Sequence, residues 1–167
     1  AYAGAGTPGY TGDGGSALLA QLNSPYGLAV DLAGNLYIAD LGNAVVRRVT
    51  PGGIISTVAG GGEDSGEGAQ ATDSVLQAPR NLAVTSDGTL YISDFGANRV
   101  LAVQPDGRLR YVAGNGTAGS AGDTGPPTTA QLRNPAGIAF DSSGWLYIAD
   151  SGNKRVRRVA NGRISTV

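Results

Sequence analysis

The sequence predicts an all-β protein that contains three copies of a four-stranded antiparallel unit. A motif recurs three times along the 167 residues with a nearly constant spacing. Within each copy, short apolar runs rich in Val, Ile and Tyr alternate with turn sequences, as is typical of all-β chains. The chain contains 28 glycines, which supply the backbone conformations that frequent tight turns require. A four-stranded unit repeated at this spacing is typical of a propeller blade, so we expect three blades of a β-propeller.

Three tyrosines mark the repeat most clearly. Tyr37, Tyr91 and Tyr147 occupy the same position in the three copies and are 54 and 56 residues apart. This identical placement predicts that the tyrosines pack between blades rather than contact a ligand. The difference of two residues lies in the middle linker, which is shorter than the others. The copies comprise residues 25–31 with 35–40, 79–85 with 89–94, and 135–141 with 145–150.

Each copy divides into four short strands separated by turns rich in Asp, Asn and Gly. In the first copy the expected strands are residues 28–30, 36–39, 45–49 and 54–59. The first strand is apolar and uncharged, so we place it nearest to the propeller axis. The third strand carries arginines, so we place it near the solvent-exposed outside. A short helical turn is expected before each blade, at residues 16–22, 69–76 and 128–132.

We expect a single domain in which glycine-rich linkers cross between the blades. The predicted linkers are residues 1–26, 60–80 and 114–136. The predicted blades are residues 27–59, 81–113 and 137–167.

Missing residue types exclude several functions. The chain has no cysteine and no histidine, so Ser-His-Asp, Cys-His and His-ligated zinc chemistry cannot exist within it. Its 12 basic and 13 acidic side chains give a net charge of -1, which provides no global attraction to nucleic acid or anionic membranes. No apolar run approaches the ~18 residues of a membrane span, and no signal segment is recognised. We therefore predict no catalytic activity, cofactor, metal, nucleic-acid partner or membrane partner, and we make no prediction of the cellular compartment.

The repeat resembles the NHL repeat of β-propellers. The resemblance rests on Pro-x-Gly-Leu/Ile-Ala-Val/Phe-Asp, followed by Gly-x-Leu-Tyr-Ile-Ala-Asp, Gly-Asn and Arg-Val, and it covers nearly all of the chain. The second copy departs at Asn81, where the others have glycine, and at Ala97, where the others have asparagine. NHL propellers generally have six blades, so the resemblance implies that this chain provides half of a ring.

The two ends of the chain suggest how a ring would close. Residues 3–7 align with residues 113–117, which follow a fourth strand, and residues 164–167 align with residues 55–58 of such a strand. Two copies joined head-to-tail would therefore form a six-bladed homodimer with a nearly continuous junction. The interface is expected at Ala1, Tyr2, Ala3, Ile164, Thr166 and Val167.

A ligand site is predicted at the mouth of the central channel. Tyr26, Arg80 and Ala136 immediately precede the three inner strands and differ between the copies. Residues at this position would face the channel opening, where propellers usually bind ligands. A cation and an aromatic ring from separate blades would hold an anionic or sugar-like molecule. Ordinary variation between repeats is the alternative interpretation.

Two sets of carboxylates have both a structural and a metal-binding interpretation. One carboxylate ends each second strand: Asp40, Asp94 and Asp150. We expect these to accept hydrogen bonds from backbone N–H groups of the following turn, rather than to form a ring of cation ligands. Another recurs in each linker: Asp13, Glu67 and Asp123. A calcium site needs ~6–8 oxygen ligands, so these linker carboxylates favour a solvated or helix-capping role.

The middle linker has the highest density of acidic residues and is the best candidate for calcium among the linkers. Its acidic residues are Glu63, Asp64, Glu67 and Asp73. A solvated acidic loop remains the favoured interpretation.

Five cations lie within the last fourteen residues: Lys154, Arg155, Arg157, Arg158 and Arg163. NHL domains of some regulatory proteins bind RNA through a basic face, so the resemblance raises this function. On a strand, alternation would place Arg155 and Arg157 on one face and Arg158 on the other. No stacking aromatic is expected beside them. We therefore expect a solvated outer strand rather than an RNA-binding surface.

The predicted function is that of a non-catalytic NHL-type half-propeller, of natural or engineered origin, that self-assembles into a six-bladed homodimeric ring. The alternative is a module that binds a ligand or partner at the mouth of the channel. A metal-dependent enzyme is less favoured. NHL-type amidating lyases use histidine ligands for zinc, which this chain lacks, and no arrangement like the carboxylate–amide metal site of six-bladed lactonases is found in the sequence.

Overall fold

The computed structural model describes residues 1–63 and 66–167 and contains three four-stranded antiparallel sheets, one for each repeat. Blade one contains β1 (Pro25–Val30), β2 (Leu36–Asp40), β3 (Val45–Val49) and β4 (Ile55–Ala59). Blade two contains β5 (Pro79–Val84), β6 (Leu90–Asp94), β7 (Arg99–Val103) and β8 (Leu109–Ala113). Blade three contains β9 (Pro135–Phe140), β10 (Leu146–Asp150), β11 (Arg155–Ala160) and β12 (Arg163–Thr166). The all-β class and the three blades are confirmed.

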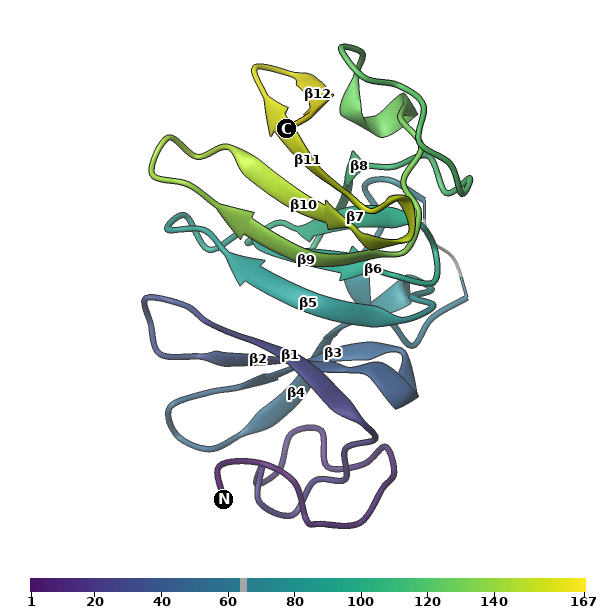
Figure 1. Cartoon of the computed structure of the whole chain (residues 1–167). Coiled ribbons are helices and arrows are strands. Elements are labelled where there is room, and N and C mark those ends of the chain that lie inside the picture. The colour runs from purple at the N-terminus through teal and green to yellow at the C-terminus, as the bar shows by residue number, and fades with distance from the viewer. Residues whose placement is uncertain (64–65) are drawn as a thin grey trace.

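The blades stack in sequence order, with the N-terminus beside blade one and the C-terminus in blade three (Figure 1). β1 lies against β5, and β5 lies against β9. The fourth strands β4 and β8 lie against the 3-10 helices η2 (Ala71–Asp73) and η3 (Pro127–Thr129) of the following linkers. The sheets thus approach each other most closely at their first strands, and the linkers fill the wider space outside. This arrangement makes β1, β5 and β9 the inner strands, as the sequence predicts.

The helical turns predicted in the linkers are short. η2 lies within the predicted segment 69–76, η3 overlaps the start of the predicted segment 128–132, and each makes one turn. The segment 16–22 forms hydrogen-bonded turns, in which the Leu19 N–H donates to the Ser16 carbonyl (3.0 Å). Two further 3-10 helices follow the second strands of blades one and three: η1 (Leu41–Asn43) and η4 (Ser151–Asn153).

Each inner strand contains a β-bulge near its start. Pro25 pairs with Asp40 and Leu28 pairs with Ile38, so β1 has one more residue than β2 over this stretch. The same irregularity occurs at the starts of β5 and β9. Because pairing continues through the bulge, the strands begin two residues before the predicted blade boundaries at residues 27, 81 and 137. A bulge also changes the direction in which its side chains point from the sheet.

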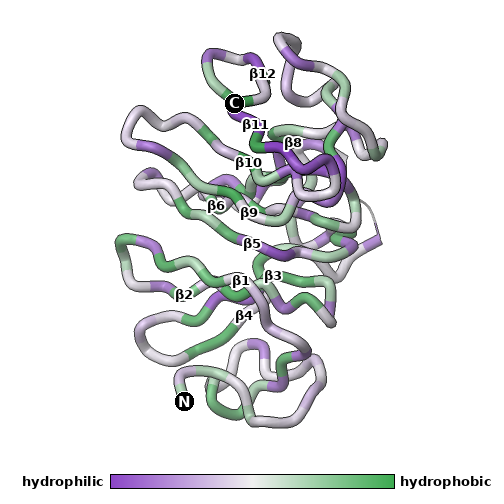
Figure 2. The backbone as a smooth tube through the Cα atoms, in the orientation of Figure 1, coloured by the Kyte–Doolittle hydropathy of each residue, from purple (hydrophilic) through white to green (hydrophobic). Residues whose placement is uncertain are grey.

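Apolar side chains fill the spaces between the blades. Between blades one and two, Ala39 and Val46 pack with Leu82 and Ile92. A separate cluster joins blades two and three and includes Val100 and the fully buried Ile164. Figure 2 shows apolar residues concentrated along the strands and polar residues in many of the turns.

Two of the three repeat tyrosines lie in these interblade spaces. Tyr37 belongs to the cluster between blades one and two. Tyr91 packs edge-on against Phe140 of blade three, with ring centroids 4.7 Å apart. Tyr147 occupies the same position on the far side of blade three, which no further blade of this chain covers.

Candidate functional site

The predicted channel-mouth residues all lie at the bulges of the inner strands. Tyr26 is in β1, Arg80 is in β5 and Ala136 is in β9, each one residue after the first residue of its strand. The structure brings the first two together across the boundary between blades one and two. The Arg80 guanidinium carbon lies 5.2 Å from the centre of the Tyr26 ring.

A third residue, which the sequence analysis missed, completes this group. Phe95 follows β6 directly, and its ring centre lies 3.7 Å from the Arg80 guanidinium carbon. The guanidinium is therefore stacked closely on Phe95 and more loosely on Tyr26. Such cation–π contacts contribute about 0.5–2 kcal/mol each, depending on how far the cation is desolvated. The signal available in the sequence was that Phe95 replaces Leu41 and Ser151 of the other repeats.

Arg80 has no carboxylate partner among residues 1–63 and 66–167. Four other arginines lie within 4.0 Å of a carboxylate: Arg47, Arg99, Arg108 and Arg157. The Nε of Arg80 is buried and has no hydrogen-bond acceptor in the described part of the chain. The side chain is half-buried as a whole. Its orientation is thus set by aromatic rings rather than by an ion pair.

Ala136 does not add a functional side chain to this group. Its carbonyl oxygen instead accepts a hydrogen bond from the Ser93 hydroxyl (3.0 Å). The neighbouring Asn81 uses its side-chain oxygen to accept the Ile138 N–H (3.0 Å). Asn81, the departure from glycine in the second repeat, therefore links the inner strands of blades two and three.

Two arginines that were expected near the solvent-exposed outside are in fact fully buried. Arg47 in β3 and Arg157 in β11 have no exposed side-chain surface. Arg47 Nη2 lies 2.6 Å from Asp13 Oδ1, and Arg157 Nη2 lies 2.8 Å from Asp123 Oδ1. The prediction for the third strand was wrong for these positions because the first and third linkers fold back and each supplies a carboxylate. Asp13 and Asp123 thus form ion pairs with buried arginines, a role that the sequence analysis did not predict.

The hydrogen bonds at these linker carboxylates change their acidity. Burial raises the pKa of Asp13, but hydrogen bonds from Thr57 and Arg47 outweigh burial and lower the pKa below its ordinary value. The pKa of Asp123 is lowered in the same way, because hydrogen bonds from Thr166 and the charge of Arg157 outweigh its desolvation. Both carboxylates are therefore held in their ionised form.

The carboxylates at the ends of the second strands have partners different from those expected. Asp40 Oδ1 accepts the Asn23 N–H (2.7 Å), and Asp150 Oδ1 accepts the Arg133 N–H (2.7 Å). These donors belong to the linker before each inner strand, not to the following turn. The turn contributes a side chain instead, since Asn43 Nδ2 donates to Asp40 Oδ2 (2.7 Å). The backbone of this turn is satisfied within η1, where the Ala44 N–H donates to the Leu41 carbonyl oxygen.

Blade two lacks most of this arrangement. Leu101 stands where the other blades have a buried arginine, and Ala97 stands where they have asparagine. Asp94 Oδ1 still accepts backbone N–H groups from Gln77 and Ala78, but Asp94 Oδ2 is buried without a hydrogen-bond donor in the described chain. Arg99 Nε lies 3.5 Å from this oxygen. Burial raises the pKa of Asp94 despite these partners.

The described residues contain no group of three or more His, Cys, Asp or Glu side chains that could hold a metal ion. Within the acidic middle linker, Asp64 lies outside the described residues. The repeating carboxylates at the second-strand ends belong to separate sheets, and their ion-pair partners within residues 1–63 and 66–167 are arginines.

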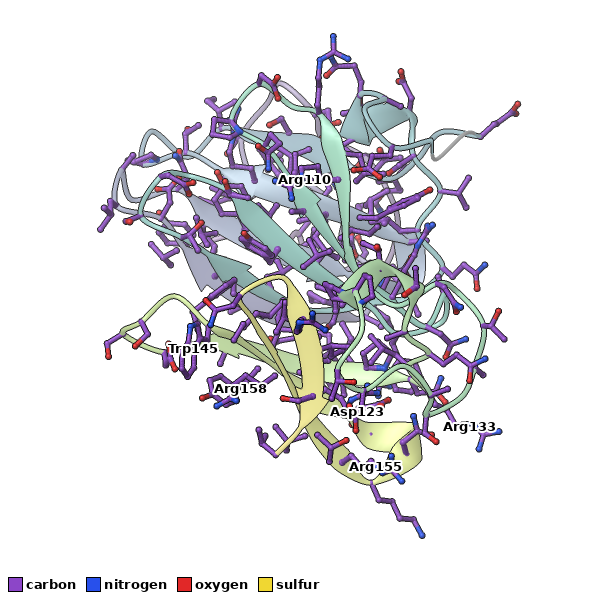
Figure 3. All side chains as sticks on the ribbon, turned by 90° about the horizontal axis from the view of Figure 1, so that it is seen from above. Arg110, Asp123, Arg133, Trp145, Arg155 and Arg158 are labelled. Carbon is purple, nitrogen blue, oxygen red and sulfur yellow. The ribbon has the colours of Figure 1, made fainter. Side chains whose placement is uncertain are left out.

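The basic C-terminal segment divides into separate parts. Arg157 is buried, whereas Lys154 and Arg155 are exposed. The Arg158 guanidinium carbon lies 4.7 Å from the centre of the Trp145 ring, so the expectation that no aromatic lies beside this segment was wrong. Trp145 comes from the preceding turn, which antiparallel pairing of β10 and β11 brings alongside. Figure 3 shows Trp145 and Arg158 on one side of blade three and Arg155 on another.

Blade one has an uncovered apolar face. Leu28 is 58% exposed, whereas Leu82 and Ile138 at the same repeat position are 4% and 8% exposed. Val30 in the same strand is also exposed. The first linker covers the outer part of this face, where Ala17 and Ala20 pack on Ile55. The inner part, which another blade covers in the second and third repeats, remains open.

Blade three has the complementary uncovered face. Val156 is 44% exposed, whereas Val46 and Val100 at the same repeat position are 0% exposed. Val156 lines a shallow hollow of about 320 Å³ together with Tyr147 and Ala149. This hollow is the surface on which the next blade packs in the first two repeats.

The N-terminal segment follows the course that the repeat predicts. Gly4 N–H donates to the Ala17 carbonyl (2.8 Å), as Gly60 N–H donates to the Ala71 carbonyl (2.9 Å) after β4. The N-terminal segment therefore runs as though it followed a fourth strand.

The expected interface residues differ in their exposure. Tyr2 and Val167 are 57% and 58% exposed, and Ala1 is also exposed. Ala3 is half-buried and packs against the cluster that contains Ala17, Ala20 and Ile55. Thr166 is exposed, and its hydroxyl donates to Asp123. Ile164 does not reach the open face, because its side chain points into the space between blades two and three.

Comparisons with known proteins agree with this architecture. Residues 6–65 match the family model of the teneurin NHL domain, and residues 132–159 match that of the NHL repeat. The chain belongs to the NHL-repeat β-propellers. Teneurin-m of Drosophila melanogaster is 36% identical over 177 residues, a match that covers 96% of this NHL chain and 6% of Teneurin-m. The NHL chain thus spans about 6% of the length of the curated relatives it matches.

Two solved structures share the fold of this NHL chain at low sequence identity. A crystal structure of a nidogen/laminin complex gives a TM-score of 0.64 at 21% identity, over 90% of this chain and 51% of that one. Virginiamycin B lyase from Staphylococcus aureus gives a TM-score of 0.57 at 19% identity, over 85% of this chain and 40% of that one. Across the described residues, no helix has the length and apolar character needed to cross a bilayer.

Proposed function

We propose that this chain is a non-catalytic NHL scaffold that pairs head-to-tail with a second copy of itself to form a six-bladed ring. The observation that carries the proposal is the exposure of Leu28 at a position that is buried in the other two repeats. Soluble proteins rarely leave such apolar surfaces uncovered. The two open faces are complementary because each is a copy of a face that is already paired within the chain.

The repeat specifies how the second copy would sit. Val156 of one copy would cover the first face of blade one in the other copy, as Val46 covers the first face of blade two. Six blades in a ring are related by ~60°, so three blades span ~180° and two copies close the ring. The exposed Tyr2 and Val167 would then meet at each junction.

The mass of the particle in solution tests this proposal. Sedimentation equilibrium at micromolar concentration is expected to give twice the chain mass of 16.7 kDa. A folded monomer or a nine-bladed trimer would contradict the ring. Two variants identify the surfaces: Leu28→Asp and Val156→Asp should each weaken association at least about tenfold, because each buries an unpaired charge at the junction.

Matched variants separate head-to-tail pairing from other dimers. Leu32→Asp changes a residue that is 88% exposed in a turn, so it should leave the mass unchanged. A symmetric dimer that uses only the first face would be disrupted by Leu28→Asp but not by Val156→Asp, and that result would overturn the proposal. Val167→Asp should weaken the assembly more than Leu32→Asp does.

The proposal of a non-catalytic role rests on the chain's chemistry. With no histidine or cysteine, the chain lacks the usual general base and the thiolate nucleophile. Metal-dependent turnover that is lost on changing one carboxylate would contradict this part of the proposal, and Asp13 is the first to test.

A second function is favoured by the cation–aromatic group at the inner-strand bulges. We propose that Tyr26, Arg80 and Phe95 form a ligand-binding site at the mouth of the channel. Two of these positions were selected from the sequence alone, and their side chains lie within cation–π distance. Loss of ligand binding in Arg80→Gln, with the fold intact, is the result expected.

A further inference from the structure

We infer that Arg80 is the recognition element for a ligand that carries a single carboxylate on an apolar body. This inference rests on the ligand-binding function proposed above and names the ligand class of that site. It concerns one chain and does not require ring closure.

The aromatic rings contact the planar face of the Arg80 guanidinium, so the outer end of the guanidinium remains available to a ligand. The guanidinium carbon lies 3.7 Å from the Phe95 ring centre and 5.2 Å from the Tyr26 ring centre. Stacking uses the planar face of the guanidinium and leaves its in-plane N–H groups free to donate. Two parallel N–H groups of an arginine match the two oxygens of a carboxylate.

Arg80 also lacks the carboxylate partner that three arginines of the third strands, Arg47, Arg99 and Arg157, have. Arg47 and Arg157 bind linker carboxylates, and Arg99 lies beside Asp94. The carboxylate next to Phe95 in sequence is that of Asp94, but its oxygens face the Gln77 and Ala78 N–H groups and Arg99. The charge of Arg80 is therefore not neutralised by any carboxylate within 4.0 Å in residues 1–63 and 66–167.

The burial of the Arg80 Nε defines which end of the guanidinium a ligand can reach. This Nε–H has no acceptor in the described chain, but solvent does not reach it, so it is not the donor that would meet a ligand. The two Nη groups of Arg80 are not buried in this way. One N–H from each of them points along the outer end of the guanidinium, and this parallel pair matches the two oxygens of a carboxylate.

The surroundings favour a monocarboxylate over a phosphate. One guanidinium balances one negative charge, whereas a phosphate monoester carries about −1.5 to −2 at neutral pH. The adjoining Tyr26 and Phe95 rings offer apolar surface beside the charged edge. Benzoate and a peptide C-terminus that ends in leucine present the same chemistry, a planar anion next to an apolar group.

The site is preorganised by both neighbouring blades. Tyr26 is fixed at the bulge of β1, Arg80 at the bulge of β5, and Phe95 at the turn after β6. Contact of the guanidinium with two aromatic rings reduces the side-chain freedom that binding would otherwise remove. If the ring closes, the two-fold axis would place two such sites around one channel.

Heteronuclear NMR titration of the whole chain tests the inference. The probes are benzoate and N-acetyl-leucine, each compared with its neutral amide, together with inorganic phosphate. We expect saturable shifts of the Arg80 Nε–H and of the Phe95 backbone amide with the two carboxylates, at a Kd of about 1 mM. The amides and phosphate should produce no saturable shift. Equal responses to benzoate and benzamide, or no saturable response to either carboxylate, would overturn the inference.

Variants assign the response to Arg80. Arg80→Gln should weaken benzoate binding at least about tenfold, and Arg80→Lys should also weaken it because the paired N–H groups are lost. Arg158→Gln is the matched control, since Arg158 also stacks on an aromatic ring but lies elsewhere on blade three. Unchanged circular dichroism and amide spectra establish that each variant is folded. An Arg158→Gln effect equal to that of Arg80→Gln would overturn the assignment.

Separate outcomes distinguish this inference from the functions on which it rests. Saturable binding of phosphate or of a neutral sugar at Arg80, without carboxylate binding, would retain the ligand site and overturn the ligand class. A monomeric mass with normal benzoate binding would overturn the ring and support this inference. A peptide with a free C-terminal leucine that binds more tightly than benzoate would support a protein C-terminus as the source of the carboxylate.

Discussion

Arg47 Nη2 lies 2.6 Å from Asp13 Oδ1, and this contact joins a fully buried strand residue to the linker that precedes its blade. The same pairing recurs in blade three, between Arg157 and Asp123. Tyr10 lies over the Arg47 guanidinium as well, with its ring centre 5.1 Å away. The first and third linkers are therefore each attached to the following blade by an arginine that has no exposed side-chain surface.

Asp13→Asn is expected to destabilise the fold by about 2 kcal/mol, because removing one partner leaves a buried guanidinium incompletely paired. Asp40, 3.8 Å from Arg47, limits the loss. Chemical denaturation measures the effect. Glu67→Gln is the control, since blade two has the buried Leu101 in place of the arginine. An equal loss in both variants would contradict the pairing as the cause.

The stabilisation from Asp13 and Asp123 should depend on pH. Their folded-state pKa values are lowered, so their contribution is present above the unfolded pKa of about 3.9 and is lost as the pH falls below it. The difference in unfolding free energy between the wild type and Asp13→Asn should therefore be large at pH 7 and shrink towards pH 3. Denaturation curves at several pH values measure this, and a difference that does not change with pH would refute the linkage.

Ala97→Asn is expected to stabilise the chain by about 1 kcal/mol at neutral pH. In blade one, Asn43 donates to Asp40 Oδ2, and blade two lacks this donor at Asp94. The folded-state pKa of Asp94 is raised, so its ionisation opposes folding as the pH rises from about 3.9 towards that folded value. A new donor should lower the pKa of Asp94 and relieve this cost.

NMR titration of the Asp94 carboxyl carbon and thermal unfolding at pH 7 check the Ala97→Asn variant. Asn153→Ala is the reverse change in blade three, where Asn153 Nδ2 donates to Asp150 Oδ2 (2.8 Å), and it should be destabilising. An unchanged Asp94 pKa in Ala97→Asn would mean that the new amide does not reach the carboxylate.

Gly27→Ala and Gly137→Ala change the same repeat position and should differ in effect. A Cβ at Gly27 would collide with the Arg80 backbone carbonyl oxygen, whereas a Cβ at Gly137 would have Ala149 Cβ as its nearest neighbour, at 3.6 Å. Gly27→Ala should cost about 2 kcal/mol, as overpacking commonly does. Gly137→Ala should leave the unfolding free energy of the isolated chain nearly unchanged.

The two glycine variants are compared by thermal unfolding at a concentration where the chain is monomeric. At higher concentration, Gly137→Ala should reduce association if a second copy covers blade three. Equal destabilisation by both substitutions in the monomer would show that Gly137 is already tightly packed and that the face is not open.

The sequence determined the repeat, the number of blades, the order of strands within each blade and which positions are equivalent between the copies. These follow from local information. A strand requires only a short apolar run with turn residues on either side, and threefold repetition makes such a pattern distinctive. The equivalence of positions such as Tyr26 and Arg80 could therefore be read directly from the aligned copies.

Only the tertiary structure decided which partner each polar side chain has. Arg47 resembles a solvent-exposed residue in the sequence, because the carboxylate that permits its burial lies 34 residues earlier in a linker. Phe95 joins Arg80 because a turn of blade two reaches the bulge of its own inner strand. Leu28 and Leu82 have the same local sequence signal, yet one is exposed and the other buried. Strand alternation fixes the direction of a side chain, but the neighbour that it meets depends on contacts between distant segments, which no local pattern encodes.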